Sequence, residues 1–177
     1  AALGDEGKER TLLVNGVSKS YAMTGWRIGY AAANAEIAKA MSNYLSHSTG
    51  SPCSISQQAA LAAFGESQEP SYEMKKAFDE RRKYFYERVQ NIPGVSCLMP
   101  EGAFYIFMNI KELLGKTIKG IKINNSNDFA SAFLEKGLVA VVPGSAFGAD
   151  GYVRWSYATS MENIKEGLDR LEKFLAD

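Results

Sequence analysis

The spacing of apolar residues predicts two strands and a helix in the first part of the chain. Residues 11–17 (TLLVNGV) and 28–33 (IGYAAA) are short, mostly β-favouring runs, and they predict buried strands. Asn34 is a suitable N-cap, because its side-chain oxygen accepts from N–H groups that a helix leaves free. Apolar residues then recur at every fourth position over residues 37–45, which predicts a helix.

A polar stretch rich in turn-forming residues divides the chain. Its sequence is GESQEPS, residues 65–71, and its glycine and proline interrupt the helical pattern. Before it, Ser54 is expected to cap a short helix, and after it Ser71 is expected to cap a long one. The pattern therefore predicts two domains, residues 1–68 and residues 69–177.

Strands and helices alternate beyond the long helix. Strands are expected at residues 95–99, 103–110, 138–142 and 152–158, and helices at residues 128–136 and after a cap at Ser160. The lysine-rich stretch at residues 111–126 follows neither period and is expected to lie at the surface. The fold class is therefore α/β, with an α/β piece followed by a smaller α+β domain.

The composition excludes several classes of protein. Twenty basic and twenty acidic side chains cancel among 177 residues, so charge gives no reason to expect nucleic acid or an anionic membrane as a partner. No apolar run is long enough to cross a bilayer, and 46% hydrophobic residues suffice for a packed core. The chain starts with AALGDEGKER and runs directly into a strand, so it is expected to begin inside a longer protein.

Few residues suit a metal ion or a disulfide. Cys53 and Cys97 match no zinc spacing, and both are interpreted as small buried residues of a protein from the reducing cytoplasm. The single histidine, His47, excludes most histidine-based metal sites and is expected at a helix end. No metal site is predicted.

Candidate chemistry is concentrated in the segment SKSYAMTGWRIGY, residues 18–30. Lys19 follows a predicted buried strand and has small and apolar neighbours, a setting in which desolvation favours the neutral amine that attacks carbonyls. Arg27 has Gly25 and Gly29 on either side, and a guanidinium suits a phosphate group. Either cation alone fits an ordinary surface charge, but together they indicate a cofactor with an aldehyde and a phosphate, such as pyridoxal phosphate.

The same segment closely resembles the pyridoxal-phosphate attachment motif of the class I and II (fold type I) aminotransferases, particularly the aspartate-aminotransferase-like branch. The resemblance continues in PEGAFYIF, residues 100–107. It also includes VVPGSAFG and GYVRWSYA, residues 141–148 and 151–158. It covers nearly the whole chain, apart from the insertion at residues 111–126.

The resemblance implies roles for three residues. Lys19 forms a Schiff base with the cofactor and later moves the proton at the substrate α-carbon. Arg27 binds the cofactor phosphate, and Arg154 binds the substrate carboxylate as a two-bond fork. The period of the last strand agrees with this role, because Arg154 shares a face with Tyr152 and Ser156.

The resemblance also implies that part of the site lies outside the chain. Gly16 stands where some members have a serine that helps to hold the phosphate. The glycine-rich phosphate turn and the residues that hold the pyridine ring precede the lysine in the family, and this chain contains neither. We therefore expect residues 1–68 to be a remnant of the cofactor-binding large domain with uncovered apolar faces, residues 69–177 to be the small domain, and the isolated chain to be inactive.

The substrate and the partners are expected from the resemblance alone. Aspartate is the first expectation, although residues 43–52 (NYLSHSTGSP) lack the arginine with which some members bind a second carboxylate. In the family this segment lies at a subunit interface, so a cytoplasmic homodimer is expected. The alternatives are an aromatic aminotransferase, a C–S lyase of the same fold, or a non-catalytic aminotransferase-like module that binds a ligand.

Overall fold

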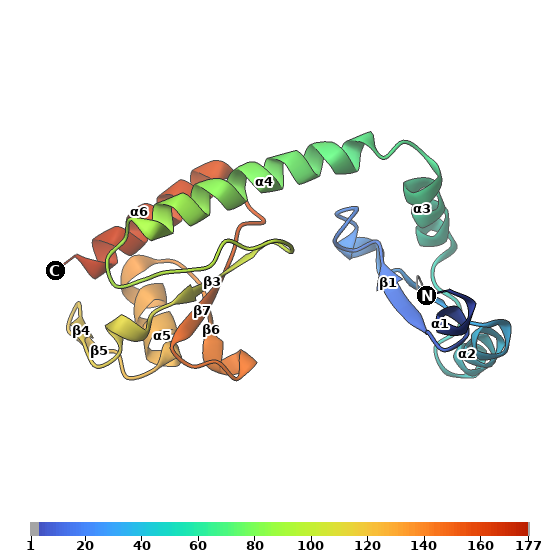
Figure 1. The fold of residues 1–177 in the computed structure, drawn as a ribbon, viewed down its shortest axis with the longest axis horizontal. Coiled ribbons are helices and arrows are strands. Elements are labelled where there is room, and N and C mark those ends of the chain that lie inside the picture. The colour runs from blue at the N-terminus through green and yellow to red at the C-terminus, as the bar shows by residue number, and fades with distance from the viewer. Residues whose placement is uncertain (1–3, 177) are drawn as a thin grey trace. The chain divides into compact units, whose positions relative to one another are not determined.

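The computed structural model describes residues 4–176, and the chain divides into two compact units. The first unit runs to Glu73 and the second begins at Met74, so the border falls within a long helix, α4 (Glu69–Gln90). Figure 1 labels the elements of both units. Each unit has its own antiparallel strand pairing.

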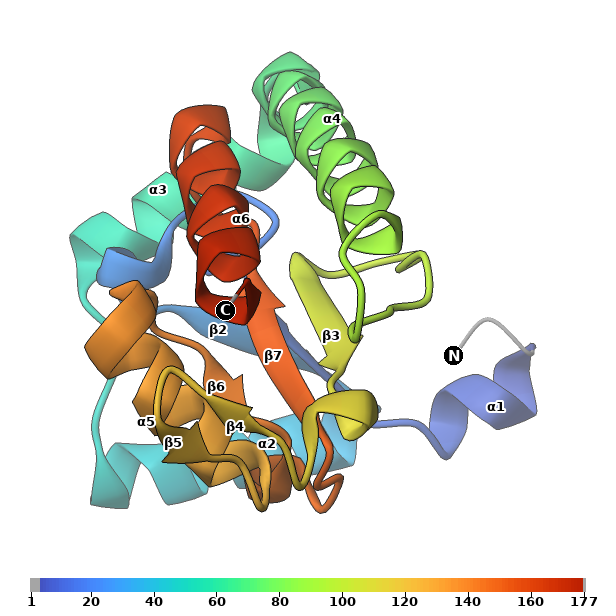
Figure 2. The same ribbon diagram turned by 90° about the vertical axis from the view of Figure 1, so that its left-hand side faces the viewer.

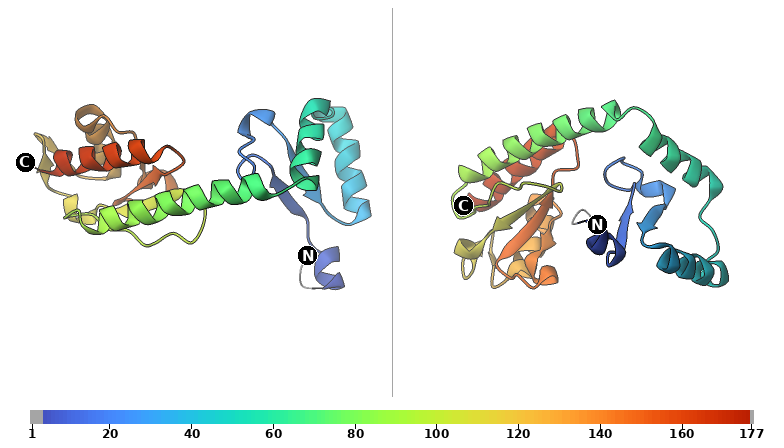
Figure 3. Two further views of the ribbon diagram at one scale, coloured as in Figure 1. Left: turned by 90° about the horizontal axis from the view of Figure 1, so that it is seen from above. Right: turned by 45° about the vertical axis from the view of Figure 1, so that its right-hand side comes forward.

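The first unit contains a two-stranded sheet and helices. In chain order its elements are α1 (Asp5–Glu9), β1 (Leu13–Gly16), η1 (Thr24–Trp26), β2 (Gly29–Ala32), α2 (Ala35–Ser48) and α3 (Ser54–Gly65). Strands β1 and β2 pair antiparallel (Figure 3). In this register Gly16 lies opposite Gly29 at one end. Both predicted strands are therefore present, each shortened to four residues.

Capping residues set the beginnings of α2 and α3. The Asn34 side chain accepts a hydrogen bond from the Ile37 N–H at 3.0 Å, as predicted. His47 lies in the last turn of α2, which is also as predicted. The cap predicted at Ser54 is wrong by one residue, because Cys53 is the N-cap of α3 and Ser54 is already helical.

The first unit buries very few side chains. Among residues 4–73, only Val17, Ser56 and Ala60 are buried. The prediction of two buried strands is wrong: every residue of β2 is exposed, and Val14 in β1 is 71% exposed. A sheet of two strands needs a second layer to cover its faces. The expectation of uncovered apolar faces in this part of the chain is confirmed.

The two cysteines lie in different surroundings. Cys53 is exposed, so its interpretation as a buried residue is wrong, whereas Cys97 is half-buried. Hydrogen bonds with the backbone of Ser56 and Ile55 lower the pKa of the Cys53 thiol. Burial raises the pKa of Cys97 to about 11, so its thiolate is scarce at neutral pH.

We expect Cys53 to react with iodoacetamide at least about tenfold faster than Cys97 near neutral pH, because the thiolate is the nucleophile. Peptide mass spectrometry over a time course measures both rates. A Cys53→Ser variant should lose the fast reaction, and the control Cys97→Ser should keep it. Equal rates at the two cysteines would contradict the exposure difference.

The second unit is built on a three-stranded antiparallel sheet. After α4 its elements are β3 (Tyr105–Asn109), η2 (Lys111–Leu113), β4 (Thr117–Ile118), β5 (Ile121–Lys122), α5 (Ser126–Gly137), β6 (Val142–Pro143), η3 (Gly144–Phe147), β7 (Tyr152–Ser156) and α6 (Met161–Leu175). Strand β7 lies between β3 and β6 and is antiparallel to both (Figure 2). Strands β4 and β5 form a separate ribbon.

Successive side chains of β3 and β7 point to opposite faces of the sheet, and one of these faces packs into the core of the second unit. Ile106, Met108, Val153 and Trp155 are buried on this face. The helices α4, α5 and α6 complete the core with Phe85, Val89, Phe129, Phe133, Ile164, Leu168 and Leu171. This unit therefore closes a hydrophobic core from its own residues.

Polar contacts hold α4 and α6, which lie side by side (Figures 1 and 3). Arg88 of α4 donates to Asp169 at 2.7 Å and to Glu172 at 2.8 Å, both on α6.

The helix cap predicted at Ser160 is confirmed, because its hydroxyl accepts from the N–H three residues later at 3.2 Å, at the start of α6. The cap predicted at Ser71 is wrong, since α4 already begins at Glu69.

Within residues 4–176, no helix has the length and apolar character needed to cross a membrane.

The lysine-rich stretch at residues 111–126 is more ordered than predicted. It contains the β4–β5 ribbon, and Leu113, Ile118 and Ile123 are buried in the core. These apolar residues are separated by lysines and glycines, so they follow neither the helical nor the strand period. The expectation of a surface insertion is therefore wrong for its apolar positions.

Two of the predicted strands are largely irregular. Residues 95–99 contribute only an isolated bridge between Ser96 and Asn109, and Leu98 is 89% exposed. Of residues 138–142, only the last belongs to a strand, because Leu138 adopts a left-handed φ of 55° that ends α5. The short apolar runs in the sequence therefore predicted more strand than the structure contains.

Gly137 ends α5 against the ring of Phe133. A Cβ at this position would lie 2.4 Å from that ring, which packs against Trp155 and Phe174. We expect Gly137→Ala to lower the free energy of unfolding by about 1–3 kcal/mol. The matched control is Gly167→Ala in α6, where a Cβ meets Trp155 at an ordinary 3.5 Å and helix propensity predicts a gain of up to about 1 kcal/mol. Urea unfolding measures both, and a gain for Gly137→Ala would contradict the predicted clash.

Candidate active site

The loop between β1 and β2 contains both cations of the segment singled out in the sequence. It spans residues 17–28, with Lys19 in a turn near its start and Arg27 directly after η1. Antiparallel pairing of Gly16 with Gly29 joins the two ends of this loop. The structure therefore places Lys19 and Arg27 in one loop whose two ends are paired.

Two glycines allow the strands to approach each other at the base of this loop. A Cβ on Gly16 would lie 3.2 Å from the carbonyl oxygen of Ile28, and a Cβ on Gly29 would lie 3.0 Å from that of Asn15. Such distances are shorter than most real Cβ contacts, so larger residues would push the strands apart. Gly16, where some members of the family have a serine, thus has a structural role here.

The backbone at Arg27 is left-handed, with a φ of 51°. This conformation costs a residue other than glycine about 1–2 kcal/mol, and such residues are frequent at binding sites. One guanidinium nitrogen, Nη1, donates to the Thr24 carbonyl oxygen at 2.9 Å. Most N–H donors of the guanidinium remain for an anion.

Lys19 is exposed, so the apolar surround predicted for its amine is not formed by the described residues. The prediction is wrong because β1, the strand that precedes this lysine, lacks a covering layer. The loop is held nearby by Tyr21, whose ring packs edge-on against Phe64 at 5.4 Å and whose hydroxyl donates to Gln68 at 3.1 Å.

Arg154 lies on the face of the second unit's sheet that points away from the core. Its neighbours along β7, Val153 and Trp155, are buried on the opposite face. Strand register places Phe107 of β3 and Val142 of β6 opposite Arg154. The alternation predicted for this strand is therefore confirmed.

Aromatic rings hold the Arg154 guanidinium. Its Cζ atom lies 4.4 Å from the centroid of the Tyr105 ring and 4.7 Å from that of Phe147. No acidic side chain in the described part of the chain forms an ion pair with it. A guanidinium stacked on rings keeps its N–H edge for a planar partner, so this geometry suits a carboxylate.

Sequence reasoning missed Tyr105 and Phe147 as partners of Arg154. Tyr105 shares the outer face of β3 with Phe107, so alternation along the strand was a usable signal. Phe147 belongs to η3, where no periodic pattern identifies its direction. Phe107 also stacks parallel on Tyr152 at 5.0 Å, which extends the aromatic surface beside the guanidinium.

The side chains of Lys19 and Arg27 offer complementary chemistry. Lys19 supplies a primary amine and Arg27 a guanidinium, a donor set that fits the aldehyde and the phosphate of a single cofactor. Both belong to the first unit, and Arg154 belongs to the second. Within the described ranges, no three histidine, cysteine, aspartate or glutamate side chains gather in a way that suits a metal ion.

Comparison with known proteins identifies similar sequences and structures. Residues 1–171 match the family described as aminotransferase class I and II. The chain is 47% identical over 175 residues to an aspartate aminotransferase of Bacillus subtilis, and the match covers 99% of this chain and 44% of that protein.

The chain is also similar to solved structures of aminotransferases. A structure of the aspartate aminotransferase from Rhizobium meliloti matches with a TM-score of 0.91 and 46% identity, over 97% of this chain and 43% of that one. An aromatic aminotransferase from Pyrococcus horikoshii matches with a TM-score of 0.83 and 39% identity, over 97% and 44%. The chain thus spans less than half the length of these relatives.

Proposed function

This chain belongs to the class I and II aminotransferases, and from this membership we propose that it is the C-terminal part of a pyridoxal-phosphate-dependent transaminase. The complete enzyme transfers an amino group from an amino acid to a 2-oxo acid. The observation that carries the proposal is the closed loop that joins Lys19 and Arg27, whose donor set fits this cofactor.

Each of three residues has a distinct task in this proposal. Lys19 attaches the cofactor through its aldehyde, and Arg27 binds its phosphate. Pyridoxal phosphate, when bound, supplies an electron sink for charge that develops at the substrate α-carbon. The Lys19 Nζ would act as the general base that takes up the proton from the substrate α-carbon. Arg154 orients that carbon by binding the substrate carboxylate through two parallel N–H···O bonds.

We also propose that residues 1–68 are the end of the cofactor-binding large domain and that residues 69–177 are the small domain. Burial supports this division, because residues 4–73 bury only Val17, Ser56 and Ala60 whereas the second unit closes its own core. In the family, the groups that hold the pyridine ring precede the lysine. The 177-residue chain alone therefore binds the cofactor weakly and has no useful activity.

Aspartate is the first candidate for the amino donor, because the similar proteins from Bacillus subtilis and Rhizobium meliloti carry that activity in their names. Aromatic amino acids are the second candidate. The aromatic surface of Tyr105, Phe107 and Phe147 beside Arg154 favours them, as does the likeness to an aromatic aminotransferase. Residues 43–52 contain no arginine, so a second carboxylate would be bound elsewhere.

The complete enzyme is proposed to be a cytoplasmic homodimer. The first unit exposes large apolar side chains, among them Val14, Tyr44, Ile55 and Leu61, and an apolar surface of this kind favours association. Both cysteines are free thiols, which fits a reducing compartment. Sedimentation velocity of the complete enzyme tests the dimer.

A transamination assay of the complete enzyme tests the proposed function. The assay contains pyridoxal phosphate, 2-oxoglutarate and either aspartate or an aromatic amino acid, and it measures glutamate. Glutamate formed together with the new 2-oxo acid supports the proposal. In a parallel reaction that supplies a cysteine S-conjugate as the amino acid, release of ammonia and pyruvate without glutamate would favour a C–S lyase. Binding of the amino acid without turnover would favour a ligand-binding module. Turnover by the 177-residue chain would contradict its proposed incompleteness.

A further inference from the structure

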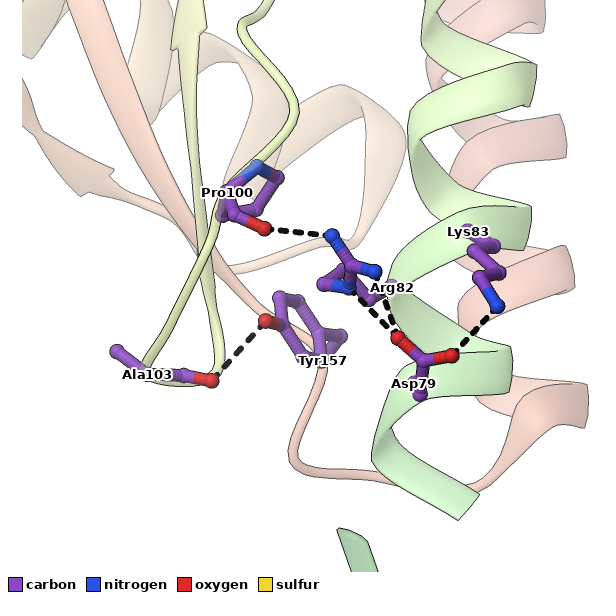
Figure 4. Close-up of polar contacts among 6 residues, drawn as sticks. All are labelled: Asp79, Arg82, Lys83, Pro100, Ala103 and Tyr157. Carbon is purple, nitrogen blue, oxygen red and sulfur yellow. Dashed lines mark hydrogen bonds and ion pairs between the residues drawn. The ribbon is translucent and has the colours of Figure 1, made fainter. Parts of the chain in front are cut away.

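Residues 100–103 form a turn that leads directly into β3, the strand that carries Tyr105. We refer to this segment as the 100–103 turn. Arg82 of α4 binds its first residue, because the Arg82 Nη1 donates to the carbonyl oxygen of Pro100 at 2.7 Å (Figure 4). A side chain from a helix thus fixes the beginning of the turn.

Tyr157 binds the other end of the 100–103 turn. Its hydroxyl donates to the carbonyl oxygen of Ala103 at 3.0 Å (Figure 4). Its backbone N–H donates to the carbonyl oxygen of Phe104 at 2.9 Å. Tyr157 is 1% exposed and directly follows β7, the strand of Arg154. Ala103 itself has a left-handed φ of 59°, a strained conformation that needs such support.

Asp79 orients the Arg82 side chain one helical turn away. The Arg82 Nε and Nη2 atoms donate to the Asp79 Oδ1 atom at 3.0 and 2.6 Å, and the Lys83 Nζ lies 2.6 Å from Oδ2. Hydrogen bonds from Lys83 and Arg82 lower the pKa of the Asp79 carboxyl, so it stays charged at neutral pH. Nη1, the guanidinium nitrogen that makes no bond to Asp79, reaches the turn.

Hydrogen bonds rather than packing hold the 100–103 turn. Glu101, Gly102 and Ala103 are exposed, and a Cβ on Gly102 would have no atom within 4 Å. A cavity of about 470 Å³, lined in part by Lys75 and Phe78, lies beside the turn. With few packing contacts, the position of the turn depends on its two side-chain donors.

We propose that Arg82 is a positioning residue for Arg154. It holds the 100–103 turn, Phe104 connects this turn to β3, and the Tyr105 ring at the start of β3 stacks on the Arg154 guanidinium at 4.4 Å. Arg82 touches no reacting group and acts through Tyr105. The inference rests on the proposed function, because it assigns Arg154 the substrate carboxylate.

The first test uses the 177-residue chain and does not depend on catalysis. The Arg154 Nε–H resonance in a ¹⁵N-correlated NMR spectrum reports the ring current of Tyr105. We expect Arg82→Gln to move this resonance toward the position of free arginine and to speed amide exchange at residues 101–105 by about tenfold. The control Lys76→Gln, at an exposed position earlier on α4, should change neither. An unmoved resonance in Arg82→Gln overturns the proposal.

The second test uses steady-state kinetics of the complete enzyme. We expect Arg82→Gln to raise KM for both the amino acid and the 2-oxo acid about three- to tenfold and to leave kcat within about twofold. Arg82→Lys should recover part of the loss, since lysine donates to Pro100 but cannot also form the fork with Asp79. An unchanged KM overturns the proposal. If Arg82→Gln does not fold, Asp79→Asn loosens Arg82 without removing it and should shift KM in the same direction.

A double-mutant cycle separates positioning from general destabilisation. If Arg82 acts through Tyr105, then Arg82→Gln combined with Tyr105→Leu should raise KM no more than the worse single variant. If the KM increase of the double variant equals the product of the two single increases, Arg82 does not act through Tyr105. If the NMR resonance moves as expected but the unmodified enzyme shows no transamination, the proposed function is wrong while the coupling of Arg82 to Arg154 stands.

Discussion

Replacing Lys19 by alanine in the complete enzyme should lower kcat by about 10⁴-fold or more. In its proposed role Lys19 supplies both the amine that would attach the cofactor and the base that would move the α-carbon proton, so this substitution would remove two contributions at once. Steady-state transamination assays measure the loss. The folded state should be unaffected, because the Lys19 side chain is exposed and lies in a turn rather than in the core.

Lys39→Ala is the matched control, since Lys39 is an exposed lysine on α2 and should leave kcat within about twofold. Borohydride reduction of the cofactor-loaded enzyme, followed by peptide mapping, should place the label on Lys19. Label spread evenly over many lysines, or a Lys19→Ala variant with normal turnover, would refute the assignment.

The second large effect concerns Arg154. Arg154→Ala should lower kcat/KM by about 10²–10⁴-fold, because two charge-assisted hydrogen bonds to the substrate carboxylate are lost. Arg154→Lys should recover little, since an ammonium cannot form the two-bond fork. Kinetics with amino acids of different side chains measure the effect.

Arg154→Ala should lower kcat/KM by nearly the same factor for every amino acid substrate, because all of them carry the α-carboxylate. Arg170→Ala provides a control in the same unit, as Arg170 binds Glu166 and the Leu138 carbonyl oxygen and should change kcat/KM little. A loss confined to acidic substrates would instead assign Arg154 to the side-chain carboxylate.

Helices of this chain were predictable where the capping chemistry is local. Asn34 and Ser160 each have a side chain that accepts from an N–H three residues later, so the sequence alone locates these starts. Strands were less predictable, because pairing depends on distant residues. Residues 95–99 have a strand-like composition but gain only one bridge, while Leu113, Ile118 and Ile123 are buried without any periodic pattern.

The three candidate residues were chosen from the sequence, but their surroundings could not be predicted from it. Lys19, Arg27 and Arg154 follow from motif and alternation. The aromatic stack on Arg154 requires Phe147, a residue of η3 whose approach to the guanidinium arises from tertiary structure. The exposure of Lys19 was also not predictable, because burial of β1 depends on a covering layer and not on the strand's own composition.

The scarcity of buried residues in the first unit bears on how the protein is made and maintained in a cell. In the 177-residue chain alone, residues 4–73 expose Val14, Tyr44 and Leu61, which the other described residues leave uncovered. This part is therefore where chaperones bind and proteases cut first. The second unit closes its own core, so we expect it to survive such cleavage as a folded body.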